Sequence, residues 1–371
     1  MGEHNNLKPK EHLDYLDSAR GIAAVMVIVC HYSGWQYGDS TGNKLAGLVF
    51  NGVDAVSFFF VLSGFVLSYK YIVLGHALDI RKFLINRVFR LWPAFFVTII
   101  ITTLSALYRS GINLTSLTET FIFNKTQFWE EALIFWSVQK YYHPGWTLVI
   151  ELGASFFLPF VIALAKKDIR YIYWMLLVTL LFGRTVGFGF LLLFIWGVLI
   201  SCLFFKITDD SFKQTKWYKY RHLILLVALV LFSSRQLDRL SPLGPSFIYV
   251  TNYLGIGFYD YSGLASFVFI AAMISSDLLK KILRLKSLLF LGKICYGIYL
   301  MHWVLNDNIF FFKAQIMQHF SSTLSAYLIV FVFYSAGTII LATLIHYTIE
   351  QPFIRMGKRI TDKMKPSLTM T

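Results

Sequence analysis

Long apolar segments, separated by short charged stretches, constrain what this chain can fold into more than any other feature. Ten are visible, at about 16–35, 53–73, 93–109, 143–165, 171–184, 186–205, 222–234, 248–274, 287–305 and 323–346. A helix needs about 20 apolar residues to cross the hydrocarbon core of a bilayer. The segments at 171–184 and 222–234 are shorter, so tilted or merged spans are expected there. The pattern predicts an all-α, polytopic membrane protein with about ten transmembrane helices.

Composition supports a membrane protein and excludes a soluble globular domain. Apolar residues make up 57% of the 371-residue chain and charged residues 15%, whereas a soluble domain carries about 25% charged residues. No Pro-, Gly- or Ser-rich linker and no internal repeat divides the sequence. We therefore expect one membrane domain over residues 1–371, with a core at about 11–356 and a basic cytoplasmic tail at 357–371.

The N-terminus and the cysteines carry no processing or metal-binding signal. Seven charged residues stand among the first twenty, so no apolar stretch of a cleavable signal peptide is expected there. The cysteines lie far apart in apolar segments, without the spacing of a metal site or a disulfide framework. They are Cys30, Cys202 and Cys295. We expect them to fill space between helices.

The distribution of basic residues decides what the net charge of +14 means. Such a charge is typical of nucleic-acid-binding proteins, and also of membrane proteins whose cytoplasmic loops collect Lys and Arg. If the N-terminus is cytoplasmic and ten segments alternate sides, 26 of the 34 Lys and Arg residues fall inside and 8 outside. If one span were missing, every later loop would lie on the opposite side of the membrane, and the excess of Lys and Arg on the inside would be lost. We therefore predict ten spans, both termini in the cytoplasm and no nucleic-acid partner.

Two polar residues in the first apolar segment share one helix face. Arg20 and His31 are eleven residues apart, which is about 20° beyond three full turns and about 16 Å of rise. On the predicted topology Arg20 lies near the cytoplasmic boundary and His31 toward the far side. This geometry suits a substrate with an anionic head at the cytoplasmic surface and a reactive end inside the membrane. A snorkelling arginine and a histidine bonded to neighbouring backbone remain the alternative.

The second and fourth segments contain further polar residues. Glu151 lies about two turns inside the fourth segment, where a carboxyl group must be neutral or paired. Its predicted depth matches that of His31, and a carboxylate that orients a histidine is a general-base arrangement. Ser63 and Gly64 form a small pair that permits close helix approach. Asp54, near the outer end of the second segment, is either a substrate contact or a helix N-cap.

Basic and polar residues elsewhere leave two interpretations open. Arg87 and Arg90 are three residues apart, so on a helix their guanidinium groups converge and favour a phosphate or a carboxylate. Ordinary positive flanking of a span is the alternative. His302 and Glu350 stand in or next to the last two segments. Packing and substrate roles are equally open for both.

Six short strings become specific through their joint order and spacing. They are LDSARG (Leu16–Gly21) followed by His31, GVD with FFFVLSGF (Gly52–Asp54 and Phe58–Phe65), RVFRLWP (Arg87–Pro93), GWTLVIELG (Gly145–Gly153), YGIYLMHW (Tyr296–Trp303) and IEQPF (Ile349–Phe353). With them the chain resembles the membrane acyltransferase-3 family almost from end to end. The resemblance implies a ten-span enzyme of the bacterial inner membrane. Such an enzyme moves an acetyl group from cytoplasmic acetyl-CoA to a hydroxyl of an extracytoplasmic polysaccharide, such as O-antigen or exopolysaccharide.

The same resemblance implies roles for five residues. Arg20 and His31 match the family's first-span pair, Arg87 and Arg90 its arginine pair, and Glu151 its fourth-span acid. The arginines would hold the phosphates of the acyl-CoA donor. His31 would act as general base or transient acyl carrier, with Glu151 orienting its imidazole. We expect membrane lipid and a polysaccharide or lipid-linked glycan acceptor as partners, and no metal.

Some members of that family carry a fused soluble SGNH hydrolase-like domain with a Gly-Asp-Ser block. Here the tripeptide at residues 38–40 stands in a short outer loop and is predicted to be a turn, so we expect no such domain. Three alternatives to O-acetyl transfer stay open, namely succinyl transfer to a periplasmic glucan, a non-enzymatic transporter or flippase of glycan, and a non-catalytic membrane scaffold. The acceptor sugar and the oligomeric state are not predicted.

Overall fold

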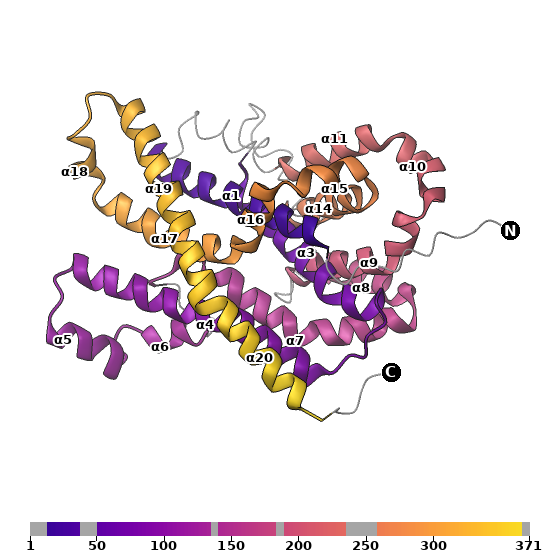
Figure 1. Ribbon diagram of the computed structural model, residues 1–371, viewed down its shortest axis with the longest axis horizontal. Coiled ribbons are helices and arrows are strands. Elements are labelled where there is room, and N and C mark those ends of the chain that lie inside the picture. Colours follow the sequence, from indigo (N-terminus) through magenta and orange to yellow (C-terminus); the bar gives the residue numbers. More distant parts are fainter. Residues whose placement is uncertain (1–12, 38–49, 135–139, 183–188, 235–257, 366–371) are drawn as a thin grey trace.

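The computed structural model describes residues 13–37, 50–134, 140–182, 189–234 and 258–365 of the chain. Over these residues every regular element is a helix, and no strand occurs (Figure 1). The predicted all-α class is therefore confirmed. The tripeptide at 38–40, which we predicted to be a turn, lies outside the described residues.

All ten predicted apolar segments coincide with helices over their described parts. These are α1 (Asp14–Tyr37), α3 (Gly52–Ile72), α4 (Ile80–Arg109), α7 (Trp146–Lys167), α8 (Ile169–Phe182), α9 (Leu191–Thr208), α11 (Arg221–Phe232), α14 (Phe258–Ser275), α16 with α17 (Lys286–Lys293 and Cys295–Phe311) and α19 (Thr323–Ile345). The ninth segment is divided into two α-helices, and the fourth begins with the short helix η2 (His143–Gly145). The apolar pattern thus locates helices well along this chain.

Fewer helices than ten are long and apolar enough to cross a membrane. Among the described residues, five helical stretches are long and apolar enough to span a bilayer. They are Gly52–Ile72, Ile80–Arg109, His143–Lys167, Leu191–Thr208 and Thr323–Lys363. Two bent pairs bring the number to seven if each pair is one span. They are Tyr261–Ser275 with Asp277–Leu283, bent by 94°, and Lys286–Lys293 with Cys295–Phe311, bent by 69°. The chain is a multi-pass membrane protein, while ten spans and two cytoplasmic termini stay predictions.

Short helices connect the long ones. They are α5 (Leu114–Leu117), η1 (Thr118–Ile122), α6 (Phe128–Ala132) and η2 (His143–Gly145) between α4 and α7, then η3 (Asp210–Gln214), α10 (Lys216–Lys219), α15 (Asp277–Leu283) and α18 (Lys313–Met317). The buried carboxylate of Glu131 in α6 accepts hydrogen bonds from the backbone N–H groups of Lys140, Tyr141 and Tyr142, at 3.1, 2.8 and 2.7 Å. Burial raises the pKa of Glu131, and these three donors oppose the rise. They hold the chain directly before α7.

Glycines let α3 and α9 touch through their backbones. A Cβ atom placed on Gly64 would lie 2.2 Å from the carbonyl oxygen of Phe194, and one on Gly197 would lie 2.1 Å from that of Val61. Neither position accepts a methyl group without moving a helix. The close approach that we predicted from Ser63 and Gly64 is therefore confirmed.

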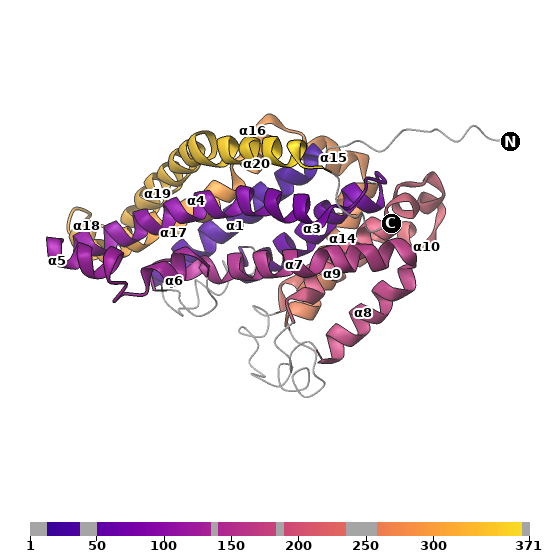
Figure 2. The same cartoon turned by 90° about the horizontal axis from the view of Figure 1, so that it is seen from below.

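The C-terminal part of the chain forms a long helical rod beside α4. It runs through α19, the π-helical turn η4 (His346–Glu350) and α20 (Gln351–Lys363), and crosses Figure 1 diagonally in yellow. Figure 2 shows α20 beside α4 from the second direction. A Cβ atom on Gly357 would lie 2.8 Å from Cβ of Phe89. The predicted basic tail thus begins inside a helix that packs on α4.

Candidate active site

One small cavity, of about 80 Å³, gathers most of the polar residues predicted for the site. Helices α1, α3, α4, α7 and α17 each contribute to its wall. Arg20, Arg87 and Arg90, which we predicted to bind an anion, all line it together with Ser63 and Glu151. We call it the arginine cavity. The structure therefore brings five of the eight predicted site residues into one place.

Arg87 binds its neighbours in the arginine cavity through two of its three guanidinium nitrogens. Its Nη2 atom lies 2.5 Å from Oε1 of Glu151, and its Nε atom donates to Oγ of Ser155 at 3.3 Å. Ser63 also donates to Oε1 of Glu151, at 3.3 Å. Arg87 is 7% exposed, so its charge depends on Glu151 for compensation in a low-dielectric setting. This ion pair joins α4 to α7, and Ser63 adds α3.

Arg90 and Arg20 also line a second cavity, of about 580 Å³, which we call the wide cavity. Lys70 and Lys293, both cytoplasmic on the predicted topology, add positive charge to its wall, which also contains carboxylates, among them Asp17. Arg20 donates to Asp17 at 2.9 Å. Within the described part of the chain, Arg90 forms no hydrogen bond and no ion pair. A guanidinium at the junction of two cavities is well placed to bind an anion.

The π-helical turn η4 supplies a second buried pair to the wall of the wide cavity. Nδ1 of His346 lies 2.8 Å from Oε2 of Glu350, and both side chains are at most 3% exposed. Gln351 lies 3.3 Å from Nε2 of the same histidine. π-helical turns often occur at functional sites. Glu350, for which the sequence left packing and substrate roles open, therefore lies at a cavity that Arg90 also lines.

Tyrosines close the arginine cavity on the side of α17. Oη of Tyr299 lies 2.7 Å from Oγ1 of Thr147 and donates to the carbonyl oxygen of Pro144 at 3.0 Å. Tyr296 donates to the carbonyl oxygen of Leu91 at 2.7 Å. These bonds attach α17 to the first turn of α7 and to α4. Neither tyrosine was predicted, because Tyr near a span end is commonly an interface anchor.

A cluster of aromatic rings around His31 lies next to that tyrosine wall. The ring centroid of His302 is 5.5 Å from that of Tyr299 and 5.2 Å from that of His31. Trp303 contacts both His31 and His143, at 5.4 and 5.5 Å. We call His31, His143, His302 and Trp303 the imidazole cluster. His31 does not line the arginine cavity, and Tyr299 and His302 connect the two.

The structure gives Glu151 a different neighbour from the one we expected. The sequence suggested that Glu151 orients the imidazole of His31. Over the described residues no hydrogen bond joins them, and Glu151 instead binds Arg87 and Ser63. His31 is surrounded by rings rather than carboxylates. Which residue pairs with Glu151 depends on how each helix is rotated about its own axis. The spacing of residues along one helix does not reveal that rotation.

Asp54 lies at the start of α3, away from the arginine cavity. Asn51 is the N-cap residue: its side-chain oxygen accepts from the backbone N–H of Asp54 at 3.3 Å. Asn51 also donates to the Asp54 carboxylate and to the carbonyl oxygen of Phe232, the latter at 3.2 Å. The capping role considered for Asp54 thus belongs to Asn51, with Asp54 as its buried partner.

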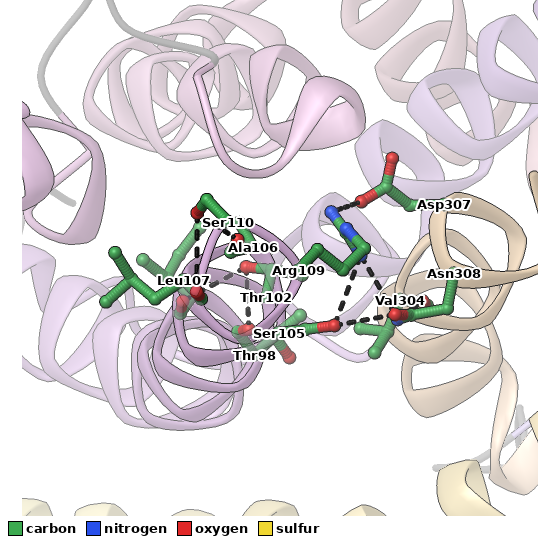
Figure 3. Close-up of polar contacts among 11 residues, drawn as sticks. Thr98, Thr102, Ser105, Ala106, Leu107, Arg109, Ser110, Val304, Asp307 and Asn308 are labelled. Atoms are coloured by element: carbon green, nitrogen blue, oxygen red, sulfur yellow. Dashed lines mark hydrogen bonds and ion pairs between the residues drawn. The ribbon is translucent and has the colours of Figure 1, made fainter. Parts of the chain in front are cut away.

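A polar network fixes the far end of α17 to the end of α4 (Figure 3). Arg109 pairs with Asp307 and donates to Oδ1 of Asn308 at 2.9 Å and to Ser105 at 3.2 Å. Its guanidinium carbon lies 5.4 Å from the ring centroid of Phe311. Because Asp307 follows His302 by little more than one turn, this network limits rotation of the helix segment that carries the imidazole cluster.

Three contributors to the site and one anchor were not predicted from the sequence. In the sequence His143 is only the start of an apolar segment, and Tyr296 and Tyr299 are only parts of a motif. Glu131 gave no signal, since a glutamate in an outer loop is usually solvated. Among the described residues no group of three or more His, Cys, Asp or Glu side chains is arranged to hold a metal ion.

Comparison with known proteins identifies the family of the chain. The family model described as an acyltransferase domain, acyltransferase-3, matches residues 13–347. The chain is also 28% identical over 173 residues to Nodulation protein 10 of Rhizobium leguminosarum bv. viciae, over 42% of this chain and 46% of that protein. It therefore spans about half the length of that relative. No solved structure matches it significantly. The chain belongs to the acyltransferase-3 family.

Proposed function

We propose that the protein is an O-acetyltransferase of the bacterial inner membrane. It moves an acetyl group from cytoplasmic acetyl-CoA to a hydroxyl of an extracytoplasmic polysaccharide, such as O-antigen or exopolysaccharide. The observation that carries the proposal is the convergence of Arg20, Arg87 and Arg90 on one cavity, with His31 farther along the helix that carries Arg20. Family membership supports acyl transfer over the transporter alternative.

The donor enters through the wide cavity. Arg90 and Arg20, at its junction with the arginine cavity, hold the phosphates, because guanidinium groups bind phosphate in bidentate fashion. Arg87 adds to the positive field while Glu151 holds it in place. The thioester arm extends along α1 toward His31, which lies about 16 Å from Arg20 along the helix. On its way to His31, the thioester arm passes Tyr299.

His31 is the proposed general base. No hydrogen bond reaches either ring nitrogen from a described residue, and the side chain is half-buried. It takes the proton of the acceptor hydroxyl as the hydroxyl oxygen bonds to the acetyl carbonyl carbon. The carbon–sulfur bond then breaks, and the leaving thiolate takes the proton from the imidazolium. The products are an O-acetyl ester and free coenzyme A.

Radiolabelled acetyl-CoA tests the proposal. Membranes that contain the protein are incubated with the labelled donor and with surface glycan from the host, and the glycan is analysed by mass spectrometry. Transfer of one or more acetyl groups, absent from membranes without the protein, is the expected result. Transfer from succinyl-CoA instead would replace the donor assignment. Absence of transfer from either donor, with the protein present at normal levels, would overturn the proposal.

A further inference from the structure

His302 presents an unpartnered ring nitrogen inside the imidazole cluster. The side chain is 0% exposed, and Nδ1 lies 2.6 Å from the carbonyl oxygen of Tyr299. A carbonyl oxygen only accepts hydrogen bonds, so Nδ1 carries the proton. A second proton would leave a buried charge among rings, which is costly. Nε2 therefore presents a lone pair, and no described residue forms a hydrogen bond with it.

The neighbour that fits this lone pair is His31. The two ring centroids are 5.2 Å apart, with the ring planes tilted by 31°. The hydroxyl of Tyr299 is already engaged by Thr147 and Pro144. The ring centroid of Trp303 lies farther from that of His302, at 6.4 Å. A neutral imidazole carries one N–H and one lone pair. His31 thus has the donor that His302 lacks, and buried acceptors are rarely left without one.

We propose that His302 is the positioning residue for His31. Its Nε2 accepts a hydrogen bond from one ring N–H of His31, directly or through one water. This bond fixes the tautomer of His31, so the other ring nitrogen turns its lone pair to the acceptor hydroxyl. The inference rests on the proposed function, in which His31 is the general base. It gives His302 the orienting role that the sequence suggested for Glu151.

Amide replacements separate this role from a structural one. In His302→Gln the amide oxygen reaches the place of Nε2, whereas in His302→Asn the amide group reaches the place of Nδ1. We expect His302→Gln to retain acetyl transfer within about tenfold of the wild type. His302→Asn and His302→Phe should lose about 100-fold in kcat, with an unchanged KM for acetyl-CoA, because general-base catalysis contributes about 10²- to 10⁴-fold.

The reverse order of the amide variants would overturn the proposal. If Asn retained activity and Gln lost it, the bond to Tyr299 would be the one that matters, and His302 would be structural. Full activity in all three variants, or inactivity of a folded His302→Gln protein that still binds donor, would overturn it as well. Purified variants are therefore compared by size-exclusion chromatography and by binding of acetyl-CoA.

A measurement that needs no turnover keeps the inference separate from the proposed function. The wild-type protein, with ¹⁵N in its histidine rings, is compared by NMR with His31→Phe. We expect the Nε2 resonance of His302 to shift when its donor is removed. An unshifted resonance would overturn the inference even if acetyl transfer occurs, and a shift would support it even if wild-type membranes transfer no acetyl group.

Discussion

The arginine cavity and the imidazole cluster share helices α1 and α17 but are held by different forces. At the cavity, Arg87 pairs with Glu151 and Arg20 with Asp17. In the cluster, His31 contacts rings, and none of the described contacts of this histidine is an ion pair. A charged region suits a polyanionic donor, whereas neutral imidazoles suit proton transfer. On the proposed function, donor binding and chemistry would therefore take place in two separate regions along the same two helices.

Replacing the central residue of the cluster should have the largest effect. His31→Gln removes the general base, so kcat for acetyl transfer should fall by about 10²- to 10⁴-fold. The KM for acetyl-CoA should stay unchanged, because the arginine cavity is untouched. Initial rates at varied donor concentration in membranes check both parameters. A large rise in KM with kcat unchanged would show that the two regions are not separate in function.

Breaking the buried ion pair should mainly affect stability. Arg87→Met leaves Glu151 without its partner and should lower the free energy of unfolding by about 3–5 kcal/mol. The double variant Arg87→Met with Glu151→Leu should regain most of that loss, since no buried charge remains. Thermal unfolding in detergent compares the two. Equal melting temperatures for the single and double variants would contradict a charge-compensating role for Glu151.

Removing the unpaired guanidinium should mainly affect donor binding. Arg90→Gln should raise the KM for acetyl-CoA about tenfold or more, as expected for loss of a charged hydrogen bond worth about 1.5–3 kcal/mol. Stability should change little because Arg90 has no ion-pair partner among the described residues. Arg355→Gln, at an exposed position on α20, is the matched control and should leave KM unchanged. Equal KM values for the two variants would remove Arg90 from the donor site.

The smallest effect is expected at the far end of α17. Asp307→Asn removes the charge partner of Arg109 but leaves Asn308, Ser105 and the ring of Phe311 in place. The melting temperature should drop by an amount that corresponds to about 1 kcal/mol. Acetyl transfer should fall less than threefold. A fall as large as that of His31→Gln would mean that this network controls the imidazole cluster directly.

Sequence reasoning located the helices and the arginines because both depend on local periodicity. An apolar run of about 20 residues forms a helix in a membrane wherever it occurs, and residues three apart on it converge. This is why Arg87 and Arg90 line one cavity as expected. The number of spans could not be predicted in the same way. Helices α8 and α11 have only 14 and 12 residues, whereas a span needs about 20.

Partners across helices were less predictable. The contact of Glu151 with Arg87 depends on how α4 and α7 are rotated against each other, which no spacing within one helix reveals. The tautomer of His302 depends on a carbonyl group of its own helix, and its neighbour His31 comes from another helix, α1. Asn51 caps α3 because its side chain reaches forward along the chain and accepts a hydrogen bond from the backbone N–H of the third residue of α3.

The backbone contact between α3 and α9 also determines the room available to a substrate. Ser63, directly before Gly64, faces the arginine cavity together with Phe59 and Phe60 of the same helix. A methyl group on Gly64 would collide with the backbone at Phe194 and displace α3. On the proposed function, Gly64 and Gly197, which do not line the cavity themselves, would set the spacing of α3 and α9 and thereby the width of the donor site.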